Sequence, residues 1–459
     1  MAAQEMRQGD DHAGNWNHAE FQRLFAAGEY ADALRRAQEN VRIEEARHAA
    51  SDELSAAYHD LGKAQLHAGS ADAAVASLLR ALQLLELTQS VASPRLMEPL
   101  TDLGEAYAAL GMHDAAIEAT QQAVAIGRRT QGLFNTEQME LLDRLAASFD
   151  ALGNFDGVDS ARRYAVLVAE KQFGPEHPDS LPAIGKLASW FELSGRYTMA
   201  RDLYERTARI ASREDGGRNV ATVTALLGVA RTHRLQYVET PELVEDSVWG
   251  DPPGEKFDPV TGQREAVAGA VERPGLDAAA RLNRRGEDAL LRSLEILNSI
   301  SDPPRDMLAR TLLEFGDWYQ TDRNLARAIS YYRRAWPLLE ETSTAESPNP
   351  LLAPRPMFYR LPPKLRRNHA IRQENVVKQQ QVEFVMTVSD RGEVSDVVRK
   401  GGDMLEGLGW QVERALNRAT FSPRFVNGEP IATPGFAFIE FCCETTSEEQ
   451  AASAAPAER

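Results

Sequence analysis

Cysteine is scarce in this sequence of 459 residues, where Cys442 and Cys443 are the only two and are adjacent in the chain. Neighbouring cysteines rarely form a disulfide with each other, because the bond geometry strains the peptide between them. They also lack the C-x-x-C spacing and the paired histidines of a zinc site. The simplest interpretation is a strand on which one faces inward and the other outward, and the redox compartment does not follow from them.

Long hydrophobic runs are also missing. No stretch approaches the ~20 consecutive apolar residues that cross a bilayer, so no membrane span is predicted. Residues 1–16 have neither the basic nor the apolar region of a signal peptide, and their polar composition predicts a disordered terminus. A start of translation upstream of Met1 would change this expectation, because a leader could then come first.

Positive charge is in short supply. Lys and Arg number 51 against 68 Asp and Glu, which gives a formal net charge of −17. This balance argues against a nucleic acid as the main partner. The charge is uneven, because residues 355–443 hold 13 basic and 10 acidic residues, whereas residues 444–459 hold one and four. The sequence therefore predicts an acidic first part, residues 1–354, followed by a mildly basic smaller domain.

The usual signatures of catalysis are missing too. The phosphate loop G-x-x-x-x-G-K-[ST], the hydrolase motif G-x-S-x-G and the zinc motif H-E-x-x-H do not occur. The nearest helical pair of histidines, His59 and His67, is eight residues apart, which is too far to share a metal without other ligands. We therefore predict no catalytic site, no cofactor and no metal, and a protein that is not an enzyme.

What the sequence does contain is a repeat, shown best by residues 171–216, in which two stripes of apolar residues at helical spacing flank a glycine. Such glycines recur 41, 42, 42 and 42 residues apart, and a small residue follows each of them five positions later. The glycines are Gly28, Gly69, Gly111, Gly153 and Gly195, and the small residues are Ala33, Ala74, Ala116, Val158 and Ala200. A period of this length predicts a solenoid, in which each helix pair buries its apolar face on its neighbours.

The repeat resembles the tetratricopeptide (TPR) family. Leu103-Gly104-x-x-Tyr107 followed by Ala116 is similar to the family signature, and so is Phe315-Gly316-x-x-Tyr319 followed by Ala328 and Tyr332. The 42-residue spacing and the linker at residues 173–179 resemble the longer, kinesin-light-chain-like subclass. The resemblance covers residues 17–342 and implies an α-helical superhelix that binds peptides or proteins on its concave face.

The period fails after residue 237. Residues 240–275 are rich in proline and glycine, and a loop of this length inside a compact region is unusual. It is either a functional arm or a disordered insertion, and we expect disorder or loose packing. Residues 277–299 then supply the delayed second helix, and residues 306–341 the last helix pair. That last pair carries an aromatic cluster, which we interpret as core and as a cap on the end of the solenoid: Trp318, Tyr319, Tyr331, Tyr332 and Trp336.

A different pattern begins after a proline-rich linker at residues 343–356. Alternating apolar residues predict strands at 382–388 and 394–398, and helical spacing predicts a helix over 404–419. Asn427-Gly428 predicts a hairpin between strands at 421–426 and 431–441. The sequence therefore predicts a small α+β domain of β-β-α-β order over residues 357–443, followed by a disordered tail at 444–459.

This domain resembles the C-terminal domain of TonB energy transducers. The resemblance lies in Tyr359 and Pro362-Pro363, in the run from Val382 to Val394 with Asp390 and Gly392, in Phe421-x-Pro423, and in Asn427-Gly428-x-Pro430. The sequence departs from the family in lacking its membrane anchor and long spacer, in having Ala419 where an aromatic residue is usual, and in having Lys400-Gly401-Gly402 after the second strand. The resemblance implies docking to a strand of an outer-membrane receptor.

The TPR resemblance also selects residues that line the concave face, by their spacing from the Leu of each first helix. Most are acidic: Glu98, Thr101, Glu105, Glu140, Asp143, Asp150, Ser189 and Glu192. One interpretation is a solvated helix face in an acidic protein. The other is a groove that attracts a basic segment, since clustered charge speeds encounter. That segment could belong to a partner, or be the basic terminal domain of this chain or its residues 364–367.

Three functions remain open from the sequence. The first is a scaffold without catalytic activity, whose solenoid binds one protein or peptide and whose terminal domain either binds another or closes the end of the solenoid. The second is an accessory of the TonB system in the bacterial envelope, and the third is an enzyme whose site carries no known signature. We favour a scaffold in the envelope, which predicts a periplasmic location, with the cytoplasm as the alternative.

Overall fold

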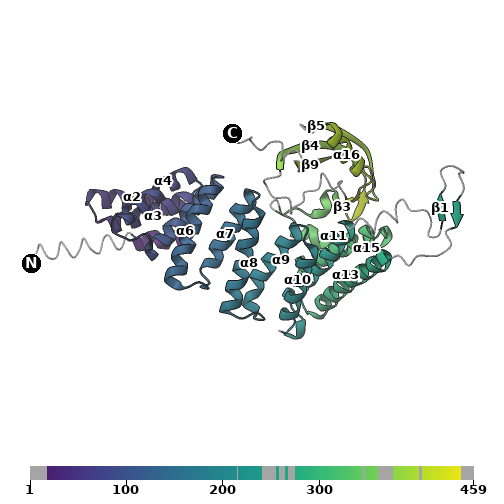
Figure 1. Ribbon diagram of the computed structural model, residues 1–459, viewed down its shortest axis with the longest axis horizontal. Coiled ribbons are helices and arrows are strands. Elements are labelled where there is room, and N and C mark those ends of the chain that lie inside the picture. The colour runs from purple at the N-terminus through teal and green to yellow at the C-terminus, as the bar shows by residue number, and fades with distance from the viewer. Residues whose placement is uncertain are drawn as a thin grey trace, which may run out of the picture. The chain divides into compact units, whose positions relative to one another are not determined.

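The computed structural model describes residues 18–213, 215–239, 255–257, 264–266, 274–344, 347–359, 376–402 and 406–445 (Figure 1). The chain divides into two compact units, residues 1–183 and 184–459. The disordered ends predicted at 1–16 and 444–459 lie outside the described residues, except that residues 444 and 445 belong to the last strand.

The first unit consists of antiparallel helix pairs. A helix over residues 18–26 opens the first pair. The helices that follow in this unit are α2 (Tyr30–Ala46), α3 (Ser51–His67), α4 (Ala71–Glu86), α5 (Met97–Ala109), α6 (His113–Gln131), α7 (Gln138–Ala151) and α8 (Phe155–Gln172), with 3-10 turns η1 (Pro94–Leu96) and η2 (Pro178–Ser180). Each pair turns at one of the predicted glycines, and Gly28, Gly69, Gly111 and Gly153 all have positive φ. The predicted helix-pair repeat is confirmed, because glycine reaches this conformation without a Cβ clash.

The repeated small residues lie where the two helices of a pair approach each other. Ala33 and Ala74 have no exposed surface, and Ala116 is 1% exposed. The glycine of the Leu-Gly signature acts at the same contact, because a Cβ on Gly104 would lie 2.5 Å from Thr120 Oγ1 of the partner helix. A larger residue would push the pair apart, so the signature is a consequence of packing.

The second unit continues the pairs, with α9 (Leu181–Leu193) crossing the unit boundary at residue 183. Its other helices are α10 (Tyr197–Ala211), α11 (Val220–Glu239), α13 (Pro274–Ser299), α14 (Arg305–Thr321) and α15 (Leu325–Thr342), with the 3-10 turns η3 (Asp215–Gly217) and η4 (Pro350–Leu352). In the predicted insertion the structure describes only an antiparallel pair, β1 (Glu255–Phe257) and β2 (Arg264–Ala266), and the other residues of 240–273 lie outside the described part. As predicted, α13 is the delayed partner of α11.

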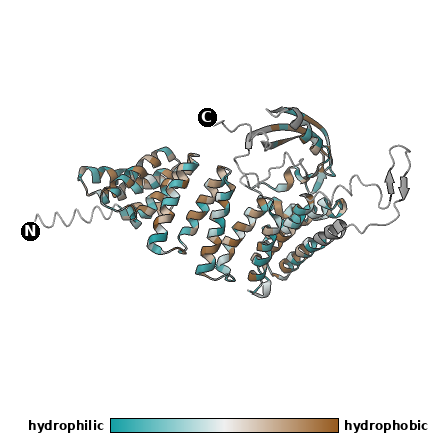
Figure 2. Cartoon of the chain, viewed as in Figure 1, coloured by the Kyte–Doolittle hydropathy of each residue, from teal (hydrophilic) through white to brown (hydrophobic). Residues whose placement is uncertain are grey.

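The helices carry both hydrophobic and hydrophilic residues around their circumference (Figure 2). This pattern fits helices that bury one face on a neighbour and leave another in water. Among the described residues, no helix is both long enough and apolar enough to cross a membrane.

The C-terminal part contains short and long strands. They are β3 (Arg355–Phe358), β4 (Val376–Val388), β5 (Val394–Gly402), β6 (Thr420–Ser422), β7 (Arg424–Val426), β8 (Glu429–Ile431) and β9 (Thr433–Thr445), with α16 (Glu406–Leu416) after β5. One antiparallel sheet has the order β5-β4-β9, while β3 pairs with β6 and β7 pairs with β8. The predicted β-β-α-β order is therefore present, with three small strands added between the helix and β9.

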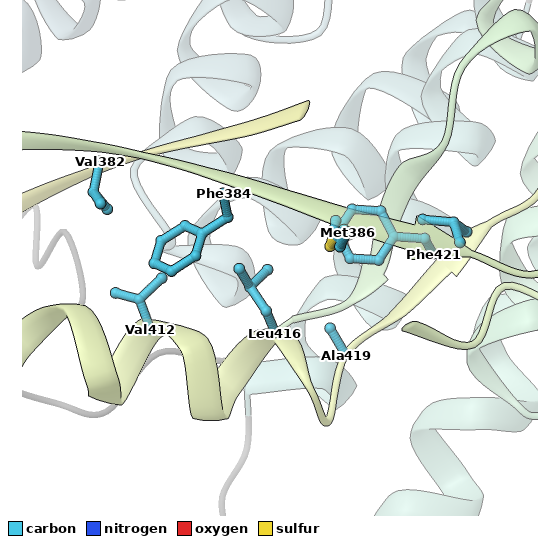
Figure 3. Close-up of a cluster of buried hydrophobic side chains, with 8 residues drawn as sticks. Val382, Phe384, Met386, Val412, Leu416, Ala419 and Phe421 are labelled. Carbon is cyan, nitrogen blue, oxygen red and sulfur yellow. The ribbon is translucent and has the colours of Figure 1, made fainter. Parts of the chain in front are cut away.

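The core of this part lies between the sheet and α16 (Figure 3). Phe384 of β4 points toward Val412 and Leu416 of the helix, and all three side chains are fully buried. Phe421 of β6 closes the same cluster. The alternation along β4 sends every second residue to this core, which is why the sequence revealed the strand.

The structure differs from the sequence prediction in two places here. Asn427 and Gly428 do form a tight turn with positive φ, but the hairpin joins only β7 and β8, while β9 pairs with β4. Pro423, which has no N–H to donate, separates β6 from β7. The predicted linker 343–356 is also more structured than expected, because η4 buries Leu351 completely and β3 begins at Arg355.

Aromatic residues of the last helix pair contact these strands. The ring of Phe425 in β7 lies 5.4 Å from that of Tyr332 and 6.5 Å from that of Trp336. Gln320 of α14 donates to the backbone oxygen of Arg391 at 3.0 Å. Tyr332 and Trp336 of the aromatic cluster predicted to cap the solenoid therefore pack against the C-terminal strands within the second unit, whereas Tyr319 and Tyr331 stack with Phe315 among the helices.

Candidate functional site

The acidic residues predicted to line the partner-binding face in the first unit are mostly paired with arginines. Arg144 of α7 donates to Glu105 of α5 at 2.5 Å and to Glu140 of its own helix at 2.8 Å. Asp143 accepts from Arg162 of α8. A carboxylate that already holds a guanidinium has less charge to offer a basic ligand, so this face is less acidic than its residue types suggest.

The remaining predicted residues of the first unit differ in exposure. Glu98 and Asp150 are exposed, and neither forms an ion pair within the described residues. Thr101 is half-buried and donates to the backbone oxygen of Met97 at 2.8 Å. Glu140 is exposed as well but holds Arg144, so Glu98 and Asp150 are the members of the set best able to meet a partner.

In the second unit, Glu192 belongs to a compact polar cluster. Tyr204 donates to its carboxylate at 2.9 Å, and Arg231 of α11 donates at 3.0 Å. Burial, together with the nearby Glu192 carboxylate, raises the pKa of Tyr204. Ser189 lies 3.3 Å from the same tyrosine hydroxyl. The two predicted residues thus meet through Tyr204, which joins α9, α10 and α11.

A histidine–aspartate ladder links the first helices of consecutive pairs, and the sequence analysis missed it. His18 Nδ1 lies 2.7 Å from Asp60 Oδ2, and His59 Nε2 lies 2.7 Å from Asp102 Oδ2. Each histidine stands ten positions before the turn glycine of its pair, and each aspartate nine before the next one. The histidines and aspartates recur at fixed distances from the turn glycines, so the sequence contained a signal for this ladder. The signal becomes visible only when the repeats are aligned with one another.

The His18–Asp60 pair of this ladder makes stability depend on pH. The hydrogen bond that His18 donates to Asp60 raises the pKa of His18 above its ordinary 6.5. The pair therefore contributes fully to the free energy of unfolding below about pH 6.5, and this contribution is lost as the pH rises through the pKa of His18 in the folded state. Because the His18 side chain is 46% exposed, we expect less than about 1 kcal/mol. NMR titration of ¹⁵N-labelled histidine, with His18→Gln for assignment, measures this, and a His18 midpoint at or below 6.5 would contradict it.

An open groove lies between α6, α7 and α8, entirely within the first unit, and we name it groove 1. Its volume is ≈ 700 Å³. Leu142, Leu145 and Phe149 of α7 form an apolar floor, and Arg128 and Asp156 stand among the polar groups around it. The Arg128 guanidinium lies 4.2 Å from the ring centre of Tyr164, which fixes both side chains at one wall. An apolar floor bordered by polar side chains can hold a segment of a partner by apolar contact, with hydrogen bonds that fix its orientation.

No group of His, Cys, Asp and Glu side chains that could hold a metal occurs among the described residues. Groove 1 contains no histidine, serine–histidine pair or paired carboxylates that would form a nucleophile and base. Its residues can bind, through apolar contact and hydrogen bonds, but they offer no arrangement for a reaction.

Comparison with family models and with curated proteins finds no match. Among solved structures, the chain is similar to a Podosopora anserina kinesin light chain with nearly identical TPR-like repeats, at 22% identity over 44% of this chain and 96% of that one, with a TM-score of 0.41. It is similar to the C-terminal part of a TPR repeat-containing protein from Cytophaga hutchinsonii, at 14% identity over 72% and 97%, with a TM-score of 0.42.

It is also similar to the apo form of RapI, at 10% identity over 73% of this chain and 79% of that one, with a TM-score of 0.47. The assignment of a TPR-like helical repeat depends on the turn glycines, small residues and helix pairs of the chain itself. The TonB-like identity of the C-terminal strands stays a prediction.

Proposed function

We propose that this protein is a scaffold without catalytic activity, whose helix pairs bind a protein or peptide partner. The observation that carries the proposal is groove 1, which leaves ≈ 700 Å³ open above an apolar floor. That space lies in the range of specific ligand sites and would accommodate several side chains of a bound segment. A solenoid offers such surfaces because each pair contacts only its neighbours and leaves its outer faces free.

A blocking substitution tests this proposal. Ser160 is exposed on α8 and lines groove 1, so Ser160→Trp fills the opening without disturbing a buried contact. Lys171→Trp, exposed on the same helix but outside the groove, is the matched control. Partners captured by proximity labelling in cells are then titrated with the purified proteins.

We expect Ser160→Trp to lower the affinity for the captured partner at least about 10-fold, because the loss of one well-packed anchor costs about 1.4 kcal/mol or more of binding free energy. Lys171→Trp should bind as the parent does. Equal affinity of all three proteins would remove groove 1 as the site, and the absence of any specific partner would contradict the scaffold itself.

A basic partner for the predicted acidic face is the finer form of this proposal. Glu98 and Asp150 support it, because they are exposed, whereas Glu105, Glu140 and Asp143 already hold arginines. Binding of this kind should weaken with salt, since the Debye length falls from about 10 Å at 0.1 M to about 3 Å at 1 M.

A second candidate is docking of the C-terminal strands to a partner in the bacterial envelope. Two observations favour it: the β-β-α-β order that the TonB resemblance requires, and the position of β9 at the edge of its sheet, where it pairs only with β4 among the described strands. An edge strand offers unpaired backbone groups to an added strand. This candidate places the protein in the periplasm, and cell fractionation that recovers it only from the cytoplasm would remove it.

A further inference from the structure

A second groove, groove 2, lies between α10, α11 and α13 in the second unit, with a volume of ≈ 650 Å³. The three helices hold the same places in their pairs as α6, α7 and α8 do around groove 1. The lining residues are Glu205, Ala208, Arg209, Ser212, Leu226, Val229, His233, Arg285, Asp288, Ala289 and Arg292.

The two grooves correspond residue by residue. Each residue of α10 and α11 in groove 2 stands 84 positions after a lining residue of groove 1, so Leu226 follows Leu142 and His233 follows Phe149. On the third helix the separation is 128, because the insertion intervenes, and Arg285 takes the place of Gly157. The residues of groove 1 therefore serve as a reference for the packing between three such helices, and the positions at which groove 2 has a different residue are the informative ones.

His233 is the most informative change. At the equivalent place in groove 1, the ring of Phe149 packs against Gly157. His233 is 1% exposed, and its Nε2 has no hydrogen-bond partner among the described residues. Arg201 lies 3.4 Å from Nδ1, and a guanidinium can only donate. Nδ1 is therefore the acceptor, and the ring hydrogen is on Nε2, where it is a buried donor without an acceptor.

The ring is also neutral at physiological pH. Burial, followed by the charges of Arg201 and Arg285, lowers the pKa of His233 to about 4. A neutral imidazole with its hydrogen on Nε2 requires an acceptor, and buried donors in folded proteins nearly always have one. In groove 1 the ring of Phe149 faces a glycine, because a Cβ on Gly157 would lie 2.5 Å from it, whereas Arg285 holds that place in groove 2. The unpaired buried donor of His233 is therefore the observation that points to a ligand.

The charges around groove 2 favour a carboxylate as that ligand. Arg209, Arg285 and Arg292 are exposed at its rim and form no ion pair among the described residues. Glu205 and Asp288 line the same rim, so the fixed charge is +1, three arginines against two carboxylates. This balance suits one carboxylate better than a phosphate dianion, and the two acids would repel a polyanion.

We propose that groove 2 binds an aspartate or glutamate side chain of a peptide segment of a partner, with the carboxylate accepting from His233 Nε2–H and held by the arginines at the rim. The volume is that of a short peptide segment and exceeds that of a single small anion. The proposal rests on the proposed scaffold function, but it concerns a different groove from the one that Ser160→Trp tests.

The experiment uses the full-length protein and two blocked peptides, acetyl-Ala-Ala-Glu-Ala-Ala-amide, which carries one carboxylate, and its glutamine counterpart. In protein with ¹⁵N-labelled histidine, the glutamate peptide should shift the Nε2–H resonance of His233 in a saturable way, and the glutamine peptide should not. His233→Gln assigns the resonance, because only the signal of His233 disappears from the spectrum, and glutamine introduces no ring opposite Arg285. Thermal denaturation of each variant confirms that it is folded.

Rhodamine-labelled peptide and fluorescence anisotropy give the affinities. Arg285→Gln should raise the Kd about 10-fold, as expected for the loss of one hydrogen bond to a charged group. Arg310→Gln, which removes the same charge from an exposed position of α14 outside the groove, should leave it unchanged. Equal binding of the two peptides, or equal affinity of Arg285→Gln and the parent, overturns the proposal. The Ser160→Trp result is independent, so a failure here is distinguishable from a failure of the scaffold function.

Discussion

Asp317→Ala is expected to destabilise the second unit by about 3–5 kcal/mol, because it removes one partner of a buried ionic network. Asp317 is 3% exposed on α14. Its carboxylate accepts from Arg355 of β3 at 2.8 and 3.1 Å and from the Tyr332 hydroxyl at 2.8 Å. Arg234 of α11, 3.9 Å away, pairs with it and with Glu314. Without Asp317, Arg355 has no remaining counter-charge in this network.

The expected loss corresponds to a decrease in melting temperature of about 6–20 °C for a unit of this size. Because the chain has two units, hydrogen exchange of α14 and β3 should accompany the melting curve, to show which unit has weakened. Glu340→Ala, an exposed carboxylate on α15, is the control and should change the melting temperature little. A change for Asp317→Ala as small as that of the control would show that the network contributes no net stability.

This network also explains why the C-terminal strands pack against the last helix pair. Burial raises the pKa of Tyr332 well above its ordinary value, with the Asp317 carboxylate as the next cause, so the hydroxyl remains a donor. Together with the contact of Tyr332 and Phe425, it joins α14, α15, β3 and β7. The end of the helical array is therefore covered by strands of the same chain, instead of a polar capping helix.

The sequence predicted the helix pairs well because their determinants are local and repeated. The turn at Gly111 requires only that this residue adopts positive φ. Ala116, five residues further along, has to be small only because the other helix of its pair lies close to it. It also predicted β4, β5 and α16, since the alternation of Val382, Phe384 and Met386 reports one buried face. These features depend on residues that are close in the chain, where periodicity is visible.

The features that the sequence did not predict depend on distant residues. Arg144 neutralises Glu105 from 39 positions away, so a list of acidic residues overstated the charge of the predicted face. The pairing of β3 with β6 joins residues more than 60 positions apart, and the linker interpretation of residues 343–356 missed it. Groove 2 could not be predicted from the sequence, because α13 corresponds to α8 only when the insertion before α13 is left out. The 42-residue period is broken there and does not show this correspondence.

Gly392→Ala is the second substitution with a large expected effect, and it tests the turn between β4 and β5. Gly392 has φ +83°, and a Cβ there would lie 1.9 Å from the backbone oxygen of Phe421. Its own backbone oxygen accepts from Phe421 N at 2.9 Å. Gln320 Nε2 of α14, which donates to Arg391 O, would lie 2.9 Å from the added carbon. The added methyl group therefore displaces β6 or the turn itself.

We expect Gly392→Ala to cost about 2–5 kcal/mol: about 1–2 from the left-handed backbone conformation and about 1–3 from overpacking. Gly435→Ala separates the two causes, because Gly435 has φ +69° but a Cβ added there would meet no atom within 4 Å. It should cost only the first part. Denaturant unfolding with hydrogen exchange of β4 and β5 measures both. Equal costs for the two variants would show that the turn relaxes away from Phe421, and that the contact between this turn and α14 does not hold the C-terminal strands against the helices.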